Sequence, residues 1–282
     1  MPITIALIGA GGKMGGRLVN NLKNNSGYRM LYCETAPAGV ASLRERGLTV
    51  TDGPVAVSQA DIVILAVPDR VIRVVSATLI AHIRPNATIV LLDPAAAMAD
   101  EVAIRPDVNY VVCHPCHPPL FGEQPTPEAR KDFFGGVSAW QDIVIALMRG
   151  SEEAFAAAER VCKAAFAPVR TAHRITVEQM AILEPAMAEV VACSAAMLMH
   201  EAMEQAIQAG VPRPAAEAFM LGHAQIPLAI VFGAIQSPFS DAAKIAIRWG
   251  TQRIINPDWR RVFEPDQVRA AVRAMLHPEE NP

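Results

Sequence analysis

The sequence contains little charge and few aromatic residues, and its cysteines do not form an even set. Charged residues make up 19% and aromatic residues 5% of the 282 positions, against 52% hydrophobic residues. The formal net charge is −3, which gives no electrostatic basis for binding nucleic acid. Five cysteines are typical of reduced thiols and not of a disulfide framework. We therefore expect a large apolar core and no nucleic-acid partner.

A basic leader and an uninterrupted apolar run of transmembrane length are also missing. Met1 and Pro2 lead straight into an apolar segment, without the basic start of a signal peptide. Every long apolar stretch is broken by proline, glycine or charge. These absences predict a cytoplasmic protein that does not interact with a membrane.

The N-terminal segment is the most informative part of the chain. An apolar run over residues 3–8 predicts a strand, and residues 13–22 predict a helix, with a glycine cluster between them. Strand, glycine-rich turn and helix form the context of a dinucleotide-binding fingerprint, in which phosphates bind at the helix N-terminus. The spacing is G-x-x-G-x-x-G with one extra glycine. The cofactor-binding residues expected here are Gly9, Gly11, Gly12, Lys13, Met14 and Gly15.

An acidic residue follows at the spacing that the fingerprint requires. Glu34 ends a second apolar stretch and lies 19 residues after Gly15. A carboxylate there accepts hydrogen bonds from ribose hydroxyls and repels a 2′-phosphate, so we expect NAD as the cofactor. The alternative is an ordinary carboxylate in an exposed loop. A third strand, over residues 61–67, ends at Val67, Pro68 and Asp69, which we also assign to the cofactor site.

Strand and helix patterns alternate through the first half of the chain. A short strand is expected over 48–51 and a helix over 70–83. Further buried strands are expected over 87–92 and 109–113, another strand over 142–148, and a last short one over 169–171. From residue 176 the pattern is helical, and residues 177–209 predict one long, largely buried helix. We predict an α/β Rossmann domain with a doubly wound, mostly parallel sheet over residues 1–175. An all-helical domain for substrate binding and dimerisation follows over 176–282.

Several strings resemble a known group of oxidoreductases. The layout resembles the 6-phosphogluconate and β-hydroxyacid dehydrogenase superfamily, whose members dimerise through their helices. The resemblance is closer to the group with a phosphogluconate-dehydrogenase-like C-terminal domain, which includes D-apionate oxidoisomerases. The strings that carry it are GAGGKMG (9–15), HPCHPPLFG (114–122), LEPAMAE (183–189), GH (222–223) and FSDAA (239–243).

The superfamily's catalytic Lys-x-x-x-Asn is absent from this chain. Lys163 and Lys244 are the only lysines beyond residue 131, and neither has Asn four residues later. The resemblance to the narrower group implies hydride transfer coupled to a carbon shift in a small branched hydroxy acid. Its chemistry is similar to that of ketol-acid reductoisomerase.

Histidines and glutamates at unusual positions are the catalytic candidates. His114 and His117 follow a central strand at the expected cofactor edge, where a histidine removes a hydroxyl proton as hydride leaves. Glu184 and Glu189 lie in an apolar helix, about 140° apart around an ideal α-helix. His223 follows Gly222 on another helical stretch. Structural roles for each remain open, as capping histidines or carboxylates paired with arginine.

These features predict an NAD-dependent oxidoreductase acting on a small polyhydroxy carboxylic acid, a sugar acid, with coupled isomerisation. The sequence does not identify metal ligands, so the metal is left unassigned, although Mg²⁺ is compatible with the chemistry. A simple hydroxy-acid or prephenate-type dehydrogenase is the alternative enzyme. A non-catalytic NAD-sensing module is the alternative from another class. The apolar C-terminal helices predict a homodimer.

Overall fold

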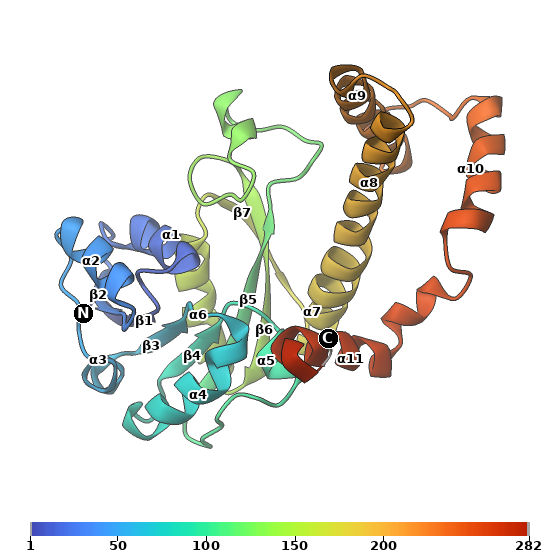
Figure 1. The fold of residues 1–282 in the computed structure, drawn as a ribbon. Helices are drawn as coiled ribbons and strands as arrows, with labels where there is room; N and C mark the ends of the chain where they lie inside the picture. Colours follow the sequence, from blue (N-terminus) through green and yellow to red (C-terminus); the bar gives the residue numbers. More distant parts are fainter. Residues whose placement is uncertain (1, 281–282) are drawn as a thin grey trace. The chain divides into compact units, whose positions relative to one another are not determined.

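The computed structural model describes residues 2–280 and divides into two compact units. The first unit comprises the residues up to 119, Gln124–Ala181 and the residues from 272 onward. The second comprises Leu120–Glu123 and Ile182–Ala271. Figure 1 shows an α/β unit in blue to yellow-green and a helical unit in yellow to red.

The first unit is built on one seven-stranded sheet, in the order β2-β1-β3-β4-β5-β6-β7. The first five strands are parallel, β6 is antiparallel to β5, and β7 is parallel to β6. The carboxyl ends of β1 to β5 and the starts of β6 and β7 therefore share one edge of the sheet. The predicted doubly wound, mostly parallel sheet is confirmed. The strands are β1 (Ile3–Ile8), β2 (Tyr28–Cys33), β3 (Ile62–Leu65), β4 (Thr88–Leu91), β5 (Asn109–His117), β6 (Gln141–Arg149) and β7 (Val169–Arg174).

Helices cover the sheet because their apolar stripes match the alternation of the strands. Ile5 and Leu7 pack with Leu18 of α1 (Lys13–Leu22) and Val161 of α6 (Glu152–Ala165) in one buried cluster. Burying each such side chain contributes about 1.5–3 kcal/mol. A second group of helices packs together: α3 (Gly53–Gln59) contacts α4 (Asp69–Leu79), which contacts α5 (Ala95–Met98). The helix α2 (Pro37–Glu45) follows β2.

Most predicted strands and helices of this unit are present, but several of their bounds differ from the prediction. The last strand, expected over 169–171, extends to Arg174. The strand expected over 48–51 is a single bridge between Tyr32 and Val50. The helix expected over 70–83 ends at Leu79 and continues as one turn of 3₁₀-helix, Ile80–His82. The strand expected to end at residue 113 extends to His117, because β6 pairs with its last residues. His114 and His117 are thus part of β5 and do not follow it.

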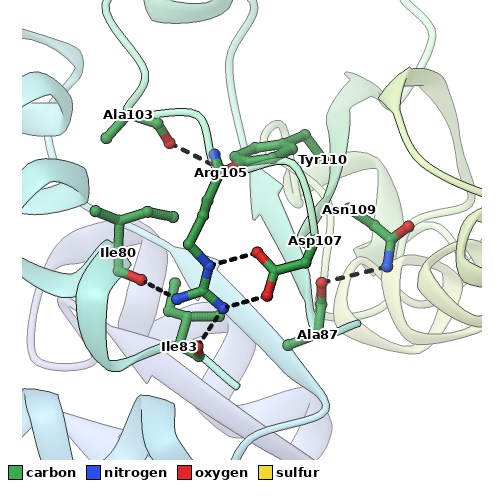
Figure 2. Close-up of polar contacts among 8 residues, drawn as sticks. All are labelled: Ile80, Ile83, Ala87, Ala103, Arg105, Asp107, Asn109 and Tyr110. Carbon is green, nitrogen blue, oxygen red and sulfur yellow. Dashed lines mark hydrogen bonds and ion pairs between the residues drawn. The ribbon is translucent and has the colours of Figure 1, made fainter. Parts of the chain in front are cut away.

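Arg105 fixes the segment that leads from α5 to β5 (Figure 2). Its guanidinium donates to the carbonyl oxygens of Ile80 and Ile83, both at 2.6 Å, and to the Asp107 carboxylate at 2.6 and 3.2 Å. The Arg105 backbone N–H donates to the Tyr110 hydroxyl at 2.7 Å. One side chain thereby satisfies two carbonyl groups at the end of α4 and orients the entry to a central strand.

The second unit is helical, and its side chains are mostly exposed. A continuous helical stretch begins in the first unit with α7 (Val177–Ala181) and continues in the second as η3 (Ile182–Cys193) and α8 (Ser194–Gln208). The second unit also contains α9 (Arg213–Val231), α10 (Asp241–Ile254) and the first part of α11 (Pro265–Leu276). The helix over 177–208 is long and apolar enough to cross a membrane, which is weak evidence by itself. Only 11% of its most apolar window is buried, so the prediction of a largely buried helix is wrong for a single chain.

The end of α11 returns to the first unit. Val272 and Leu276 are buried in a small cluster with Ala95 of α5. His277 lies with its Nε2 atom 2.6 Å from a carboxylate oxygen of Glu101. A short apolar cluster and one polar contact therefore fix the C-terminal residues of the described chain.

Candidate active site

The glycine turn after β1 is shaped so that only glycine fits at its key positions. Gly9 has a φ of +80°, where residues with a Cβ are strained. A Cβ on Gly15 would collide with the Gly9 carbonyl oxygen, and one on Gly11 would lie 2.5 Å from the Gly39 Cα atom. Gly12 caps α1 without a side-chain hydrogen bond, and the first turn contains no acidic residue. These features leave the helix N-terminus suited to a phosphate group.

Glu34 stands beside this turn at the end of β2. Its Oε2 atom accepts from the Gly11 N–H at 3.0 Å, and its Oε1 atom accepts from Thr35 and Ala36 at 2.8 and 2.9 Å. Glu34, Gly9 and Val67 line a cavity of about 340 Å³. Three backbone donors hold the carboxylate at a cavity wall, so Glu34 is not a loosely held loop residue.

The remaining predicted cofactor residues lie around the same end of the sheet. Pro68 is the N-cap of α4 and Asp69 is its first residue. Met14 packs against the core cluster under α1. The Lys13 ammonium lies 4.7 Å from the centre of the Phe134 ring, and the Arg17 guanidinium lies 4.4 Å from it. Two cations therefore gather beside the first turns of the phosphate-binding helix.

His114 is held on β5 by the backbone of the neighbouring strand region. Its Nδ1 atom lies 2.8 Å from the Leu92 carbonyl oxygen and 3.7 Å from an Asp93 carboxylate oxygen. A carbonyl only accepts, so Nδ1 carries a proton and, in the neutral ring, Nε2 carries the lone pair. Both side chains are only 16% exposed.

Asp93 is the residue of this cluster that the sequence analysis did not assign. Asp93 lies two residues after β4, and His114 lies on the neighbouring strand β5. Both are therefore near the carboxyl edge of the sheet, and this position is the signal that could have identified Asp93. Burial raises the pKa of the Asp93 carboxyl, while the His114 ring and the Ala95 N–H act in the opposite direction. The Ala95 N–H donates to Asp93 at 2.8 Å.

His117 ends β5 in an unusual backbone conformation. Its φ is +60°, which is uncommon for a residue with a side chain and is often found at functional sites. Its Nδ1 atom lies 2.9 Å from the Phe134 carbonyl oxygen, so Nε2 again carries the lone pair. The rings of His114 and His117 meet edge to face with centroids 6.1 Å apart. The structure thus brings the two predicted histidines of the first unit together.

The candidates in the second unit lie on two different helices. Glu184 and Glu189 are on η3, a π-helix that contains Pro185. Pro185 has no N–H to donate, and an i→i+5 turn holds more residues than the 3.6 of an α-helix. The separation of 140° assumes an ideal α-helix, so it does not apply to this segment, where the angle between residues five apart is smaller. His223 on α9 is exposed, stacks on Phe219 at 3.8 Å between centroids, and has Nδ1 2.9 Å from the Phe219 carbonyl oxygen.

Matches to known protein families and to known relatives extend over nearly the whole chain. The NAD binding domain of 6-phosphogluconate dehydrogenase matches residues 4–101, and the C-terminal domain of decarboxylating phosphogluconate dehydrogenase matches residues 122–276. A D-apionate oxidoisomerase of Cupriavidus necator is 43% identical, over 95% of this chain and 98% of its own. One of Blautia hydrogenotrophica is 38% identical over 98% of each chain. The chain belongs to the family of phosphogluconate-dehydrogenase-like proteins that includes these D-apionate oxidoisomerases.

Solved structures agree with this assignment. A Cupriavidus necator protein, described as a semialdehyde dehydrogenase NAD-binding protein in complex with calcium and NAD, is 42% identical with a TM-score of 0.94. The match spans 98% of the present chain and 100% of the Cupriavidus necator chain. An archaeal NADH-preferring ketol-acid reductoisomerase is 20% identical with a TM-score of 0.69, over 99% of this chain and 83% of its own. The latter supports the fold alone.

The chain is therefore an NAD-dependent oxidoreductase. This confirms the predicted cofactor and the predicted enzyme class, and it sets aside the non-catalytic NAD-sensing module. The glycine turn and Glu34 are the parts of the structure that suit NAD, since the carboxylate matches a ribose diol and repels a phosphate.

Proposed function

We propose that the enzyme oxidises D-apionate with NAD and rearranges its carbon skeleton. Relatives with this name are 38–43% identical and match over almost the full chain. The observation in the structure that carries the proposal is the cluster of Asp93, His114 and His117 at the carboxyl edge of the sheet. In open α/β sheets that edge is where ligands bind.

The oxidation step needs an acceptor for the hydroxyl proton while hydride passes to NAD. We assign this role to His117, because its Nδ1 proton is donated to the Phe134 carbonyl and Nε2 carries the lone pair. The carbon shift that follows breaks one carbon–carbon bond and forms another, with no net change of oxidation state. It needs a second base and an acid, which we assign to Glu184, Glu189 and His223 as a group.

We propose that Asp93 and His114 would hold a divalent cation, which would supply the electrophile for the carbon shift. Asp93 offers a carboxylate oxygen, a donor that suits both Mg²⁺ and Mn²⁺, and His114 offers Nε2, a nitrogen donor that suits Mn²⁺ better than Mg²⁺. The contact of His114 Nδ1 with a backbone carbonyl is the outer-shell arrangement typical of a metal-binding histidine. A bound cation supplies Lewis-acid polarisation of a carbonyl oxygen. The relative described with calcium is consistent with such a site.

The decisive experiment measures NADH formation with D-apionate and determines the product structure by NMR. A rearranged keto acid supports the proposal. A keto acid with the original skeleton favours the simple hydroxy-acid dehydrogenase, and no turnover on D-apionate excludes the proposed substrate. Dialysis against EDTA should abolish the rearrangement, with recovery on adding Mg²⁺ or Mn²⁺. Calorimetric titration of Mn²⁺ should show binding to the wild type and none to Asp93→Asn.

We further propose a cytoplasmic homodimer formed through the helical domain, with residues 1–175 binding NAD and residues 176–282 serving substrate binding and dimerisation. The described residues of α8 and α10 include none that is buried. Large apolar side chains are exposed on this unit, including Phe219, Leu221, Phe232 and Trp249 at 60–73%. Such helices need cover, and a second copy offers matching apolar faces.

A further inference from the structure

A second cavity lies at the same edge of the sheet, in the first unit. Of the residues that line it, only His117 has a role in the proposed reaction. Its volume is about 400 Å³, within the range of small-molecule sites. The end of β5 and the starts of β6 and β7 form its walls. The lining residues are Cys116, His117, Pro119, Trp140, Gln141, Asp142, Arg170 and Thr171.

The cavity is lined by one carboxylate, Asp142, and one guanidinium, Arg170. The two groups differ in the polar partners that the protein gives them. The Asp142 carboxylate accepts from the Thr171 N–H at 3.1 Å and lies 2.9 Å from His173 Nε2. Arg170 has no ion pair among the residues that the structure describes; its guanidinium lies instead over the Trp140 ring, 5.3 Å from the centroid. The cavity therefore favours an anion.

The cation–π contact with the Trp140 ring also orients Arg170 for binding. A guanidinium that lies on an aromatic ring keeps its N–H groups at the edge of its plane, where they match the two oxygens of a carboxylate. The Trp140 backbone is held in place, because its N–H donates to the Gln124 side-chain oxygen at 2.7 Å and its carbonyl oxygen accepts from the Gln124 side-chain amide at 3.1 Å. Arg170 is exposed on β7, so its guanidinium is accessible to a bound acid.

We infer that Arg170 and Trp140 form the subsite that binds the carboxylate of the sugar-acid substrate. The inference rests on the proposed function for the identity of the acid. His117 lines the same cavity, so an acid held at Arg170 presents its hydroxyl-bearing carbons to the residue that we assign as the base. The subsite selects acids over neutral sugars, because only a carboxylate compensates the guanidinium.

Calorimetry of D-apionate binding to the enzyme–NADH complex tests this, since NADH cannot accept hydride and no turnover occurs. Arg170→Met should weaken D-apionate binding at least tenfold and leave NADH affinity within twofold. The D-apionate affinity of Arg170→Lys should lie between those of the wild type and Arg170→Met. The matched control is Arg149→Met, which removes the same charge at the far end of β6. It should bind D-apionate like the wild type.

A neutral analogue, with CH₂OH in place of the carboxylate, should bind weakly and equally to the wild type and to Arg170→Met. Bound D-apionate should also slow alkylation of Cys116, which lines the cavity, and not of the exposed Cys193. Unchanged D-apionate affinity in Arg170→Met, or an equal loss in Arg149→Met, would overturn the inference.

The two proposals fail in different ways. An enzyme that binds D-apionate through Arg170 without oxidising it contradicts the proposed function and supports the subsite. If the wild type does not bind D-apionate, the same variants are compared with C4 to C6 sugar acids. Carboxylate binding lost in Arg170→Met supports the subsite, and binding of none of these acids overturns both proposals.

Discussion

At the scale of single residues, the cofactor site that we propose includes a carboxylate that also organises the backbone around it. Glu34 accepts three backbone N–H groups, two from its own loop and one from the glycine turn. These bonds fix its position at the cavity wall, and a fixed carboxylate lowers the entropic cost of the ribose contact that we propose for it.

Replacing Glu34 by Gln should reduce the preference for NAD over NADP by about tenfold to a hundredfold, or about 1.4–2.8 kcal/mol. The amide keeps the size of the side chain and removes the charge that repels a 2′-phosphate. The measurement is kcat/KM with each cofactor. A wild-type enzyme that prefers NADP, or a variant with an unchanged ratio, would contradict this role for Glu34.

The catalytic assignment is also tested at this scale. His117→Asn should lower kcat by about 10²–10⁴ while NAD affinity stays, since general acid–base catalysis contributes that much. The asparagine keeps a hydrogen-bonding group and tolerates the positive φ of this position. His82→Asn, at an exposed position of the 3₁₀ turn after α4, is the matched control and should keep its kcat. Equal turnover in His117→Asn and the wild type would remove His117 from the mechanism.

Glu184→Gln should lower kcat by a similar factor, because it removes a charge and a basic site while keeping size and hydrogen bonding. The variant is compared with Glu201→Gln, an exposed glutamate on α8. Product analysis by NMR separates the steps. Loss of rearrangement with retained NADH formation would place Glu184 in the carbon shift alone.

At the scale of elements, the segment between α5 and β5 depends on one arginine. Arg105 donates to two carbonyl groups at the end of α4 and to Asp107 (Figure 2). The Tyr110 hydroxyl accepts from the Arg105 N–H and donates to the Ala103 carbonyl at 3.1 Å, so it closes the same segment. These bonds join α4 to the strand that carries both histidines.

Arg105→Met should lower the free energy of unfolding by about 2–4 kcal/mol, because it leaves the Ile80 and Ile83 carbonyls without their donor. Asp107→Asn should cost less, since the Asp107 carboxylate is exposed to solvent and its ion pair is screened. Urea titration followed by circular dichroism measures both. Equal losses in the two variants would show that the ion pair, and not the carbonyl contacts, stabilises the segment.

At the scale of the whole molecule, the proposed dimer rests on the apolar side chains that the helical unit exposes. They occur on successive helices of this unit, from Met197 on α8 to Ile245 and Trp249 on α10. A second copy that covers them removes this apolar surface from water. We expect a stable dimer at micromolar concentration by light scattering.

Phe219→Asp, on α9, and Trp249→Asp, on α10, should each shift the light-scattering mass toward the monomer, because a buried unpaired carboxylate opposes association. Val74→Asp is the matched control, since Val74 is 67% exposed on α4 of the first unit. It should leave the dimer intact. A wild-type monomer at micromolar concentration would contradict the proposed assembly.

The sequence by itself determined the α/β domain, the glycine turn, Glu34 and the two histidines of β5. Each follows from local patterns: apolar periodicity, glycine positions and polar residues at strand ends. The tertiary structure alone decided the contact of Asp93 with His114 and that of Arg170 with the Trp140 ring, because the partners lie far apart in the sequence and their spacing does not show which residues meet. Only the tertiary structure shows whether residues 177–208 are buried or exposed. Their composition predicts burial, but a sequence does not show whether the chain itself or a second copy provides the cover, and the single chain leaves this helix exposed.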